Sequence, residues 1–167
     1  VTDALLRDPP AADWPSWRRT LDGHGYSPLD QIDRDTVTDL RLAWVVSMEE
    51  GNNQATPLVH DGMMFLAHPQ NVVQALDAAT GDVLWEYRHL VPDDAAGFGA
   101  TRTIALYGDK VFLATYDAAL VALDASTGDF AWETVKADYT SGFMHFGGPV
   151  VADGVVVSGI NGCGRYK

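Results

Sequence analysis

The chain has 167 residues, of which 47% are apolar, enough for one ordinary domain with a hydrophobic core. The formal net charge is −12, and Arg18-Arg19 is the nearest approach to a basic cluster. Because binding to a phosphate backbone requires clustered Lys and Arg residues, we expect no binding to nucleic acid. No apolar run approaches the ~20 residues of a transmembrane segment, and Val155–Val157 instead predicts a buried strand.

An eleven-residue phrase occurs twice in the chain. Residues 75–85 are ALDAATGDVLW and residues 122–132 are ALDASTGDFAW, with eight identical positions. The similarity extends to HDGMMFLA (60–67) and YGDKVFLA (107–114), and a third copy begins with PVVADGVVVSG (149–159). Self-similarity with a period near 40–50 residues is typical of the blades of a β-propeller.

The elements follow in chain order. Residues 1–40 form an entry segment, and residues 41–48 predict a strand of a closing blade whose inner strands come from the far C-terminus. The first blade, residues 54–89, is expected to hold four strands near 57–60, 63–68, 72–78 and 83–88, the second spans residues 101–136, and residues 146–167 begin a third. No stretch has a helical apolar period, so the predicted fold class is all-β.

Turn residues separate the predicted strands. Asp61-Gly62 and Gly81 tolerate the positive φ that tight turns require. Asp77 and Asp124, next to Ala-x-Thr-Gly, are expected to cap turns by accepting hydrogen bonds from nearby backbone amides.

A tryptophan ends each repeated phrase, at Trp85 and Trp132, and Trp44 has a similar setting. Burying one such side chain removes roughly 150–250 Å² from water. We therefore expect each tryptophan to pin one blade to the next.

Two and a half blades cannot close a ring, and the last unit would leave a strand edge unpaired. We expect the chain, which begins with Val1, to be part of a longer protein and to behave poorly alone.

The stretch WRRTLDGHGYSPLDQI (17–32), then DLRLAW, then the repeated ALDAxTGxxxW resemble the quinoprotein dehydrogenases of the methanol and ethanol dehydrogenase type. The resemblance implies an eight-bladed propeller with pyrroloquinoline quinone (PQQ) near the axis, of which this chain holds the opening blades. It also implies a periplasmic location.

The direction of the predicted strands indicates the edge of the ring at which a functional site would lie. Strands alternate in direction within a blade, so the residues before the first strand and those joining the second strand to the third share one rim of the ring, here named the loop rim. Gln54, the Thr101-Arg102 pair and the loop 160–163 are all expected there. Functional sites favour such loop-bearing edges.

The resemblance assigns several of these residues to the cofactor. Arg102 lies where the family has an arginine beside the quinone carbonyls, and Gln54 replaces a glutamate that touches the cofactor. Asn161, Gly162 and the adjoining Cys163 match the loop that closes over the quinone ring.

Other positions depart from the family. Its calcium-binding glutamate corresponds to Gly164, Phe146 stands where a small hydroxyl residue is common, and the adjacent cysteine pair is replaced near Ala96-Gly97. Cys163, the only cysteine, either pairs with a cysteine beyond Lys167 or remains a free thiol.

The leading interpretation is a PQQ-dependent enzyme that oxidises a primary alcohol or related hydroxyl compound, with Ca²⁺ or a lanthanide ion as the metal. The resemblance implies that electrons pass to cytochrome c or a quinone, and that the catalytic base, an aspartate, lies beyond Lys167. The alternative is a non-catalytic propeller that serves as an envelope assembly scaffold. The five histidines show no paired metal-ligand spacing.

Overall fold

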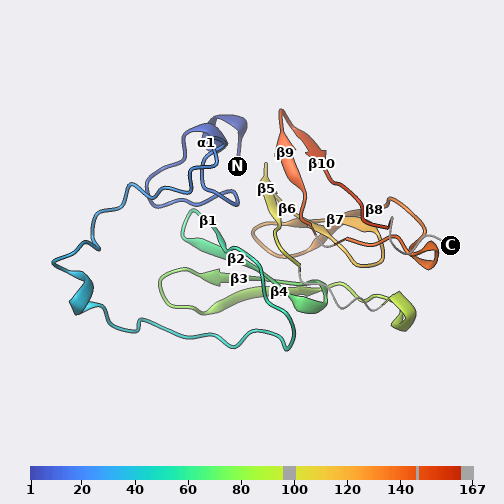
Figure 1. The fold of residues 1–167 in the computed structure, drawn as a ribbon, viewed down its shortest axis with the longest axis horizontal. Helices are drawn as coiled ribbons and strands as arrows, with labels where there is room; N and C mark the ends of the chain where they lie inside the picture. The colour runs from blue at the N-terminus through green and yellow to red at the C-terminus, as the bar shows by residue number, and fades with distance from the viewer. Residues whose placement is uncertain (96–100, 146, 163–167) are drawn as a thin grey trace.

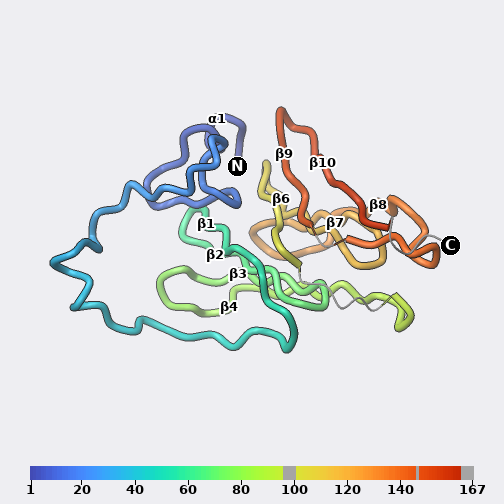
Figure 2. Tube along the Cα trace, viewed as in Figure 1, coloured from blue at the N-terminus to red at the C-terminus, as the bar shows by residue number. Residues whose placement is uncertain are grey.

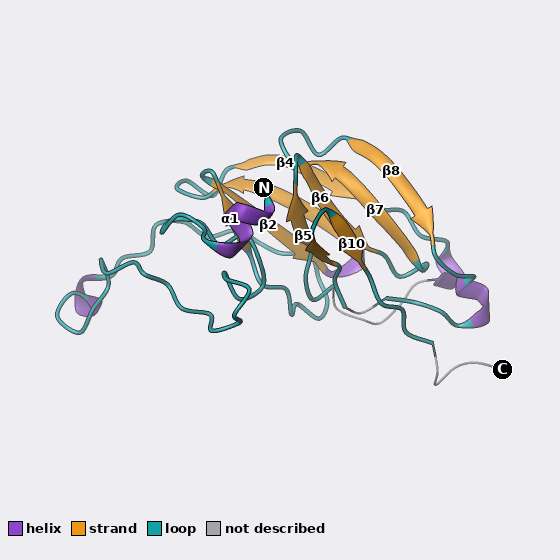
Figure 3. Cartoon of the chain, turned by 90° about the horizontal axis from the view of Figure 1, so that it is seen from above, coloured by secondary structure: helices purple, strands orange, loops and turns teal. Residues whose placement is uncertain are grey.

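A computed structural model describes residues 1–95, 101–145 and 147–162, and strands dominate it (Figures 1 and 3). Two four-stranded antiparallel sheets follow one another along the chain, and two further strands begin a third sheet. The strands are β1 (Leu58–His60), β2 (Met63–His68), β3 (Val72–Asp77), β4 (Val83–Arg88), β5 (Ala105–Tyr107), β6 (Lys110–Ala114), β7 (Ala119–Asp124), β8 (Phe130–Val135), β9 (Val150–Ala152) and β10 (Val155–Val157). The helical elements are α1 (Asp3–Arg7) and 3-10 turns at Val37–Asp39, Pro69–Asn71, Asp93–Ala95 and Tyr139–Ser141.

Each four-stranded sheet is an up-and-down blade in which the strands pair in sequence order. The strands of the first sheet start and end within one residue of the positions that the repeat predicts. Asp61 and Gly62 have φ values of +50° and +75°, the type I′ geometry of a two-residue hairpin. Asp77 accepts hydrogen bonds from the amides of Ala79 (2.8 Å) and Thr80 (3.0 Å), which confirms its predicted role as a turn cap.

Two of the three tryptophans pin neighbouring elements together, as expected. The Trp85 ring of the first blade covers Gly128 in the β7–β8 turn of the second, and its Nε1 donates to the carbonyl of Ala125 at 3.0 Å. Trp44 covers Gly81 of the first blade in the same manner. In both cases a Cβ on the glycine would lie 2.6 Å from the indole ring, so only glycine allows this contact.

The core lies between the first two sheets. Phe65, Val73 and Trp85 of the first sheet pack in one cluster with Leu113 and Val121 of the second, and all five are buried. The apolar faces of consecutive blades are thus buried against each other, which supplies the main stabilising term for both sheets.

Some expectations differ from the structure. Residues 41–48 form no strand, since the strands proposed to pair with them are not part of this chain, and that assignment stays a prediction. β10 forms, but Val155 and Val157 are exposed rather than buried, because β10 pairs only with β9 and no further blade packs on it here. The Trp132 ring is 39% exposed for the same reason.

The entry segment lies at the opposite end of the strands from the loop rim. The backbone of Trp14 pairs with Val59, and the buried carboxylate of Asp13 bonds His60 at 2.7 Å beside the β1–β2 turn. The N-terminal amine donates to the carbonyl of Gly108 in the β5–β6 turn. From about residue 24 the chain makes a wide arc away from the sheets before it returns to β1 (Figure 2). In the described part of the chain, no helix has the length and apolar character needed to cross a membrane.

The tryptophan–glycine contact can be tested with two matched glycines. Gly128 and Gly62 have φ values of +76° and +75°, but a Cβ on Gly62 would meet nothing within 4 Å. Both alanine substitutions carry the cost of a left-handed residue, about 1–2 kcal/mol, and only Gly128→Ala adds overpacking of about 1–3 kcal/mol. Urea unfolding of the complete protein should show G128A as the less stable variant. Equal free energies of unfolding would contradict the contact.

Candidate cofactor site at the loop rim

The sheet topology brings the ends of several strands to one edge. β1, β5 and β9 begin there, and β2, β6 and β10 end there, because the strands of each sheet alternate in direction. The entry segment covers the opposite end. The loop rim is therefore the edge opposite the contacts that the entry segment makes with the β1–β2 and β5–β6 turns.

Arg102 and Gln54 meet on the loop rim. They lie 48 positions apart in the sequence, in front of β5 and β1, and the guanidinium Nε donates to Oε1 of Gln54 at 3.0 Å. Gln54 in turn donates from Nε2 to the side chain of Asn52 at 3.2 Å. Both Arg102 and Gln54 are exposed, so a cation and an amide with defined orientations face the same open edge.

Asn161 and Gly162 follow β10 on the same edge. The backbone of Asn161 exchanges two hydrogen bonds of 2.9 Å with Met144, which ties the end of the third unit to the segment before β9. Gly162 packs against the ring of Phe143, where a Cβ would lie 2.6 Å from Cδ1. The structure thus holds this loop by close packing, and the glycine is sterically required.

The remaining sequence assignments fall outside the described residues. These are Cys163 and Gly164 in the quinone loop, Phe146 before β9, and the pair Ala96-Gly97 before Arg102. Among the residues that the structure does describe, no group of three or more His, Cys, Asp or Glu side chains could hold a metal ion.

Sequence reasoning missed a set of buried polar groups at the loop rim. Six buried side-chain atoms of the described residues lack a hydrogen bond of good geometry, and five of them belong to residues at the rim end of the strands: His68, Asn71, Thr101, Tyr116 and His145. His68 lies close enough to Gln74, and Tyr116 close enough to Thr101, to interact weakly. Buried polar groups in proteins are almost always hydrogen-bonded, so the side-chain nitrogens of Asn71 and His145, which lack such a neighbour among the described residues, mark places where water or a ligand completes the bonding.

Tyr116 and Thr101 lie closest to Arg102 in this set. Tyr116 is 4% exposed and Thr101 6% exposed. Burial raises the pKa of Tyr116, while the Thr101 hydroxyl, the Gln70 backbone and the charge of Arg102 act against that rise. The buried hydroxyls of Thr101 and Tyr116 therefore interact with each other close to the charge of the arginine.

A second polar contact joins the blades at this rim. His89, just after β4, bonds both carboxylate oxygens of Asp117 in the β6–β7 loop, at 3.2 and 3.1 Å. Burial acts to raise the pKa of Asp117, but hydrogen bonds from His89 and Thr115 hold it below its usual value. The next unit has Lys136 at the corresponding place after β8, where it bonds Ser158 and Gly159.

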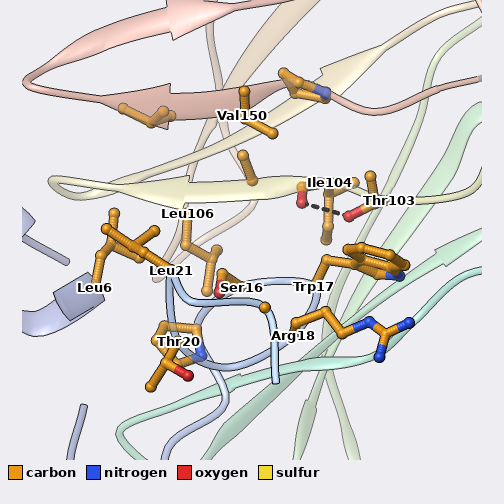
Figure 4. A pocket seen from close by; sticks show the side chains of 15 residues that line it. Leu6, Ser16, Trp17, Arg18, Thr20, Leu21, Thr103, Ile104, Leu106 and Val150 are labelled. Carbon is orange, nitrogen blue, oxygen red and sulfur yellow. Dashed lines mark hydrogen bonds between the residues drawn. The ribbon is translucent and has the colours of Figure 1, made fainter. Parts of the chain in front are cut away.

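An apolar pocket of about 320 Å³ lies between the entry segment and the innermost strands β5 and β9 (Figure 4). Trp17 and Leu21 line it from one side, and Ile104 and Val150 from the other. It extends to Thr103, the neighbour of Arg102. The pocket supplies apolar surface next to the loop rim but few polar groups.

Comparison with known proteins identifies the family. A family model for the β-propeller domain of glucose, ethanol and alcohol dehydrogenases, named PQQ, matches residues 14–157. The chain belongs to this family.

Two solved structures of this kind superpose closely. The quinohemoprotein alcohol dehydrogenase ADHIIG from Pseudomonas putida HK5 has a TM-score of 0.89 and 35% identity over 97% of this chain and 25% of its own. A europium-containing methanol dehydrogenase has a TM-score of 0.87 and 29% identity over 95% of this chain and 29% of its own. These likenesses confirm the predicted propeller fold.

Sequence relatives carry related names. The chain is 36% identical to quinohemoprotein alcohol dehydrogenase ADH IIB of Pseudomonas putida over 173 aligned positions, which cover 99% of this chain and 25% of that protein. The match to the dehydrogenase subunit of the alcohol dehydrogenase (quinone) of Acetobacter aceti is 44% identical and covers 12% of that subunit. The chain thus spans between 12% and 29% of the length of these relatives.

Protonation of His145 provides a test of the buried rim groups. Burial, assisted by the charge of Lys136, lowers the pKa of His145 from 6.5 to about 4. Between pH 6.5 and pH 4, His145 binds a proton in the unfolded chain but not in the folded protein. The free energy of unfolding therefore falls as the pH drops through this range, by about 3 kcal/mol in total.

Unfolding free energies across this pH range measure the effect. His145→Gln should remove this part of the pH dependence, whereas His24→Gln, at an exposed position of the entry segment, should retain it. An unchanged pH profile for H145Q would show that His145 is not held neutral.

Proposed function

We propose that the complete protein is a PQQ-dependent oxidoreductase that oxidises a primary alcohol or a related hydroxyl compound. The observation that carries the proposal is the Arg102–Gln54 pair, which places a cation and an amide on the loop rim of a propeller from this family. The names of the relatives, alcohol dehydrogenases and a methanol dehydrogenase, support the substrate class.

The residues of the rim fit the chemical groups of PQQ. The cofactor has anionic carboxylates and quinone oxygens, which are hydrogen-bond acceptors and suit an arginine with five N–H donors. The amide of Gln54 can both donate and accept, and the buried hydroxyls of Thr101 and Tyr116 lie nearby. When bound, PQQ would supply a quinone that can accept a hydride, which is two electrons and one proton, from the alcohol carbon.

The chain's own residues would act by orientation and charge. Gln54 accepts from Arg102 Nε and thereby directs the rest of the guanidinium, which is a fixed cation at all working pH values. Such a preorganised positive charge stabilises negative charge that develops on an oxygen as a quinone is reduced. Asn161 and Gly162 would close the site from the side of the third unit, where Met144 and Phe143 hold them.

Further parts of this function are also proposals. A Ca²⁺ or lanthanide ion would be held by ligands outside the described residues, and the europium-containing relative supports such an ion. The electron acceptor would be cytochrome c or a quinone, and the names of the quinohemoprotein relatives favour a haem partner. A periplasmic location would follow from the same family resemblance.

Replacement of the rim arginine tests the proposal. Arg102→Met keeps the aliphatic length and removes the cation, and Arg7→Met is a matched control because Arg7 pairs with Asp153 at the opposite end of the blades. In the complete protein, R102M should bind PQQ about tenfold or more weakly and lose dye-linked oxidation of short primary alcohols, because charge-assisted hydrogen bonds are lost. R7M should retain both properties.

Two results would contradict the proposal. Equal PQQ affinity of R102M and R7M would remove Arg102 from the site. A folded complete protein that does not bind PQQ would overturn the enzymatic function and favour the scaffold alternative.

A further inference from the structure

Lys136 holds the chain that leads to the candidate quinone loop. It follows β8 directly, and its Nζ donates to the carbonyl of Ser158 at 3.0 Å, to the hydroxyl of Ser158 at 2.8 Å and to the carbonyl of Gly159 at 2.7 Å. An ammonium group has three N–H donors, so this geometry uses all of them. One side chain of the second blade therefore grips two consecutive residues of the third unit.

The acceptors of Lys136 are neutral, so the contact is a set of charge-assisted hydrogen bonds and not an ion pair. Burial lowers the pKa of Lys136, consistent with a charge that no carboxylate compensates. Hydrogen bonds in which one partner is ionised are shorter and about twice as strong as neutral ones. Three such bonds are a strong tie for a segment that is otherwise weakly held.

The held segment has few other attachments. β10 pairs only with β9, and two of its three residues are exposed. Beyond it, the backbone of Asn161 bonds Met144, and Gly162 packs on Phe143. Besides the packing of Val151 and Val156 on the second sheet, Lys136 is thus a contact through which the second blade acts on residues 158–162.

In the preceding unit, His89 makes a contact across the blade boundary at the position that corresponds to Lys136. His89 lies four residues after Trp85, as Lys136 lies four residues after Trp132, and each reaches the loop after the second strand of the following unit. His89 meets the carboxylate of Asp117. Among the described residues Lys136 bonds neutral acceptors, and its charge acts on the buried His145, whose pKa it helps to lower.

We infer that Lys136 is a positioning residue for the cofactor loop: it fixes residues 158–159 so that Asn161 and Gly162 face the ligand bound at Arg102 and Gln54. This inference rests on the proposed function, since it assigns a role toward the same site. Lys136 itself does not touch the ligand. Its removal should therefore weaken cofactor binding without unfolding the blades.

The experiment uses the complete protein and a matched lysine. Lys136→Met removes the ammonium and keeps the aliphatic chain. Lys110→Met is the control, because Lys110 forms its ion pairs with Asp109 and Asp124 at the opposite end of the second blade. Two quantities are measured: amide hydrogen exchange of the PQQ-free protein at residues 158–162, and PQQ affinity with the absorption spectrum of the bound quinone.

We expect K136M to speed exchange at residues 158–162 and to weaken PQQ binding about tenfold or more, with an altered quinone spectrum. K110M should show none of these changes, and the exchange of β6 and β7 should stay the same in both variants. Ser158→Ala, which removes one of the three acceptors, should give a smaller loss that disappears in the K136M background, because the two residues share one contact.

The outcomes are distinguishable. Unchanged exchange in K136M would overturn the anchoring contact, and faster exchange with unchanged PQQ affinity and spectrum would overturn the positioning role. If the unaltered protein does not bind PQQ, the proposed function fails and the positioning role fails with it, while the exchange data still report on the anchor alone.

Discussion

The structure depends on the contact between a tryptophan of one blade and a glycine in the turn of the next. Trp85 lies flat against Gly128, and Trp44 against Gly81, and each glycine has both a positive φ and no room for a side chain. The Trp85–Gly128 contact buries a large ring and aligns the first two sheets at the turn end of the blades. The indole N–H adds direction, since it bonds a backbone carbonyl of the same turn.

Polar contacts join the blades at the loop rim, the other end of the strands. His89 reaches Asp117, and Lys136 reaches Ser158 and Gly159, each across one blade boundary. With the tryptophans at the turn end, consecutive units are connected at both ends. Residues that start different blades, such as Gln54 and Arg102, therefore keep a defined separation, which a binding site assembled from several units requires.

The loop rim combines open charge with unused hydrogen-bonding groups. Arg102 and Gln54 are exposed, whereas Asn71 and His145 are buried close to the edge with side-chain nitrogens that lack partners among the described residues. The loops after the second strands carry non-glycine residues at positive φ, namely Gln70, Asn71 and Ala118, as do the entry segment at Arg19 and the opposite turns at Asp61 and Asp153.

Much of the fold could be predicted because its determinants are local. Asp61-Gly62 and Gly81 define turns by their own conformational preferences, and the alternation of apolar residues between them predicts the strands. The repeat then gives strand direction, and strand direction alone places Gln54 and Arg102 on one rim. The tryptophan contacts were also predictable, since one large ring recurs once per unit.

Other features depended on contacts between distant segments. The residues that flank Lys136 in the sequence offered no reason to expect a buried contact, and only the packing of the third unit on the second brings it to Ser158. The one sequence feature that could have indicated its role is its position four residues after Trp132, which matches the position of His89 after Trp85. The exposure of β10 and the unpaired state of residues 41–48 likewise follow from which strands lie beside them. The sequence by itself determined the blades, their turns and the rim on which the candidate site lies, because those follow from local backbone preference and repetition. The tertiary structure decided which polar groups are buried and which residues hold the candidate quinone loop, because burial and hydrogen bonding across blades arise only when the blades pack.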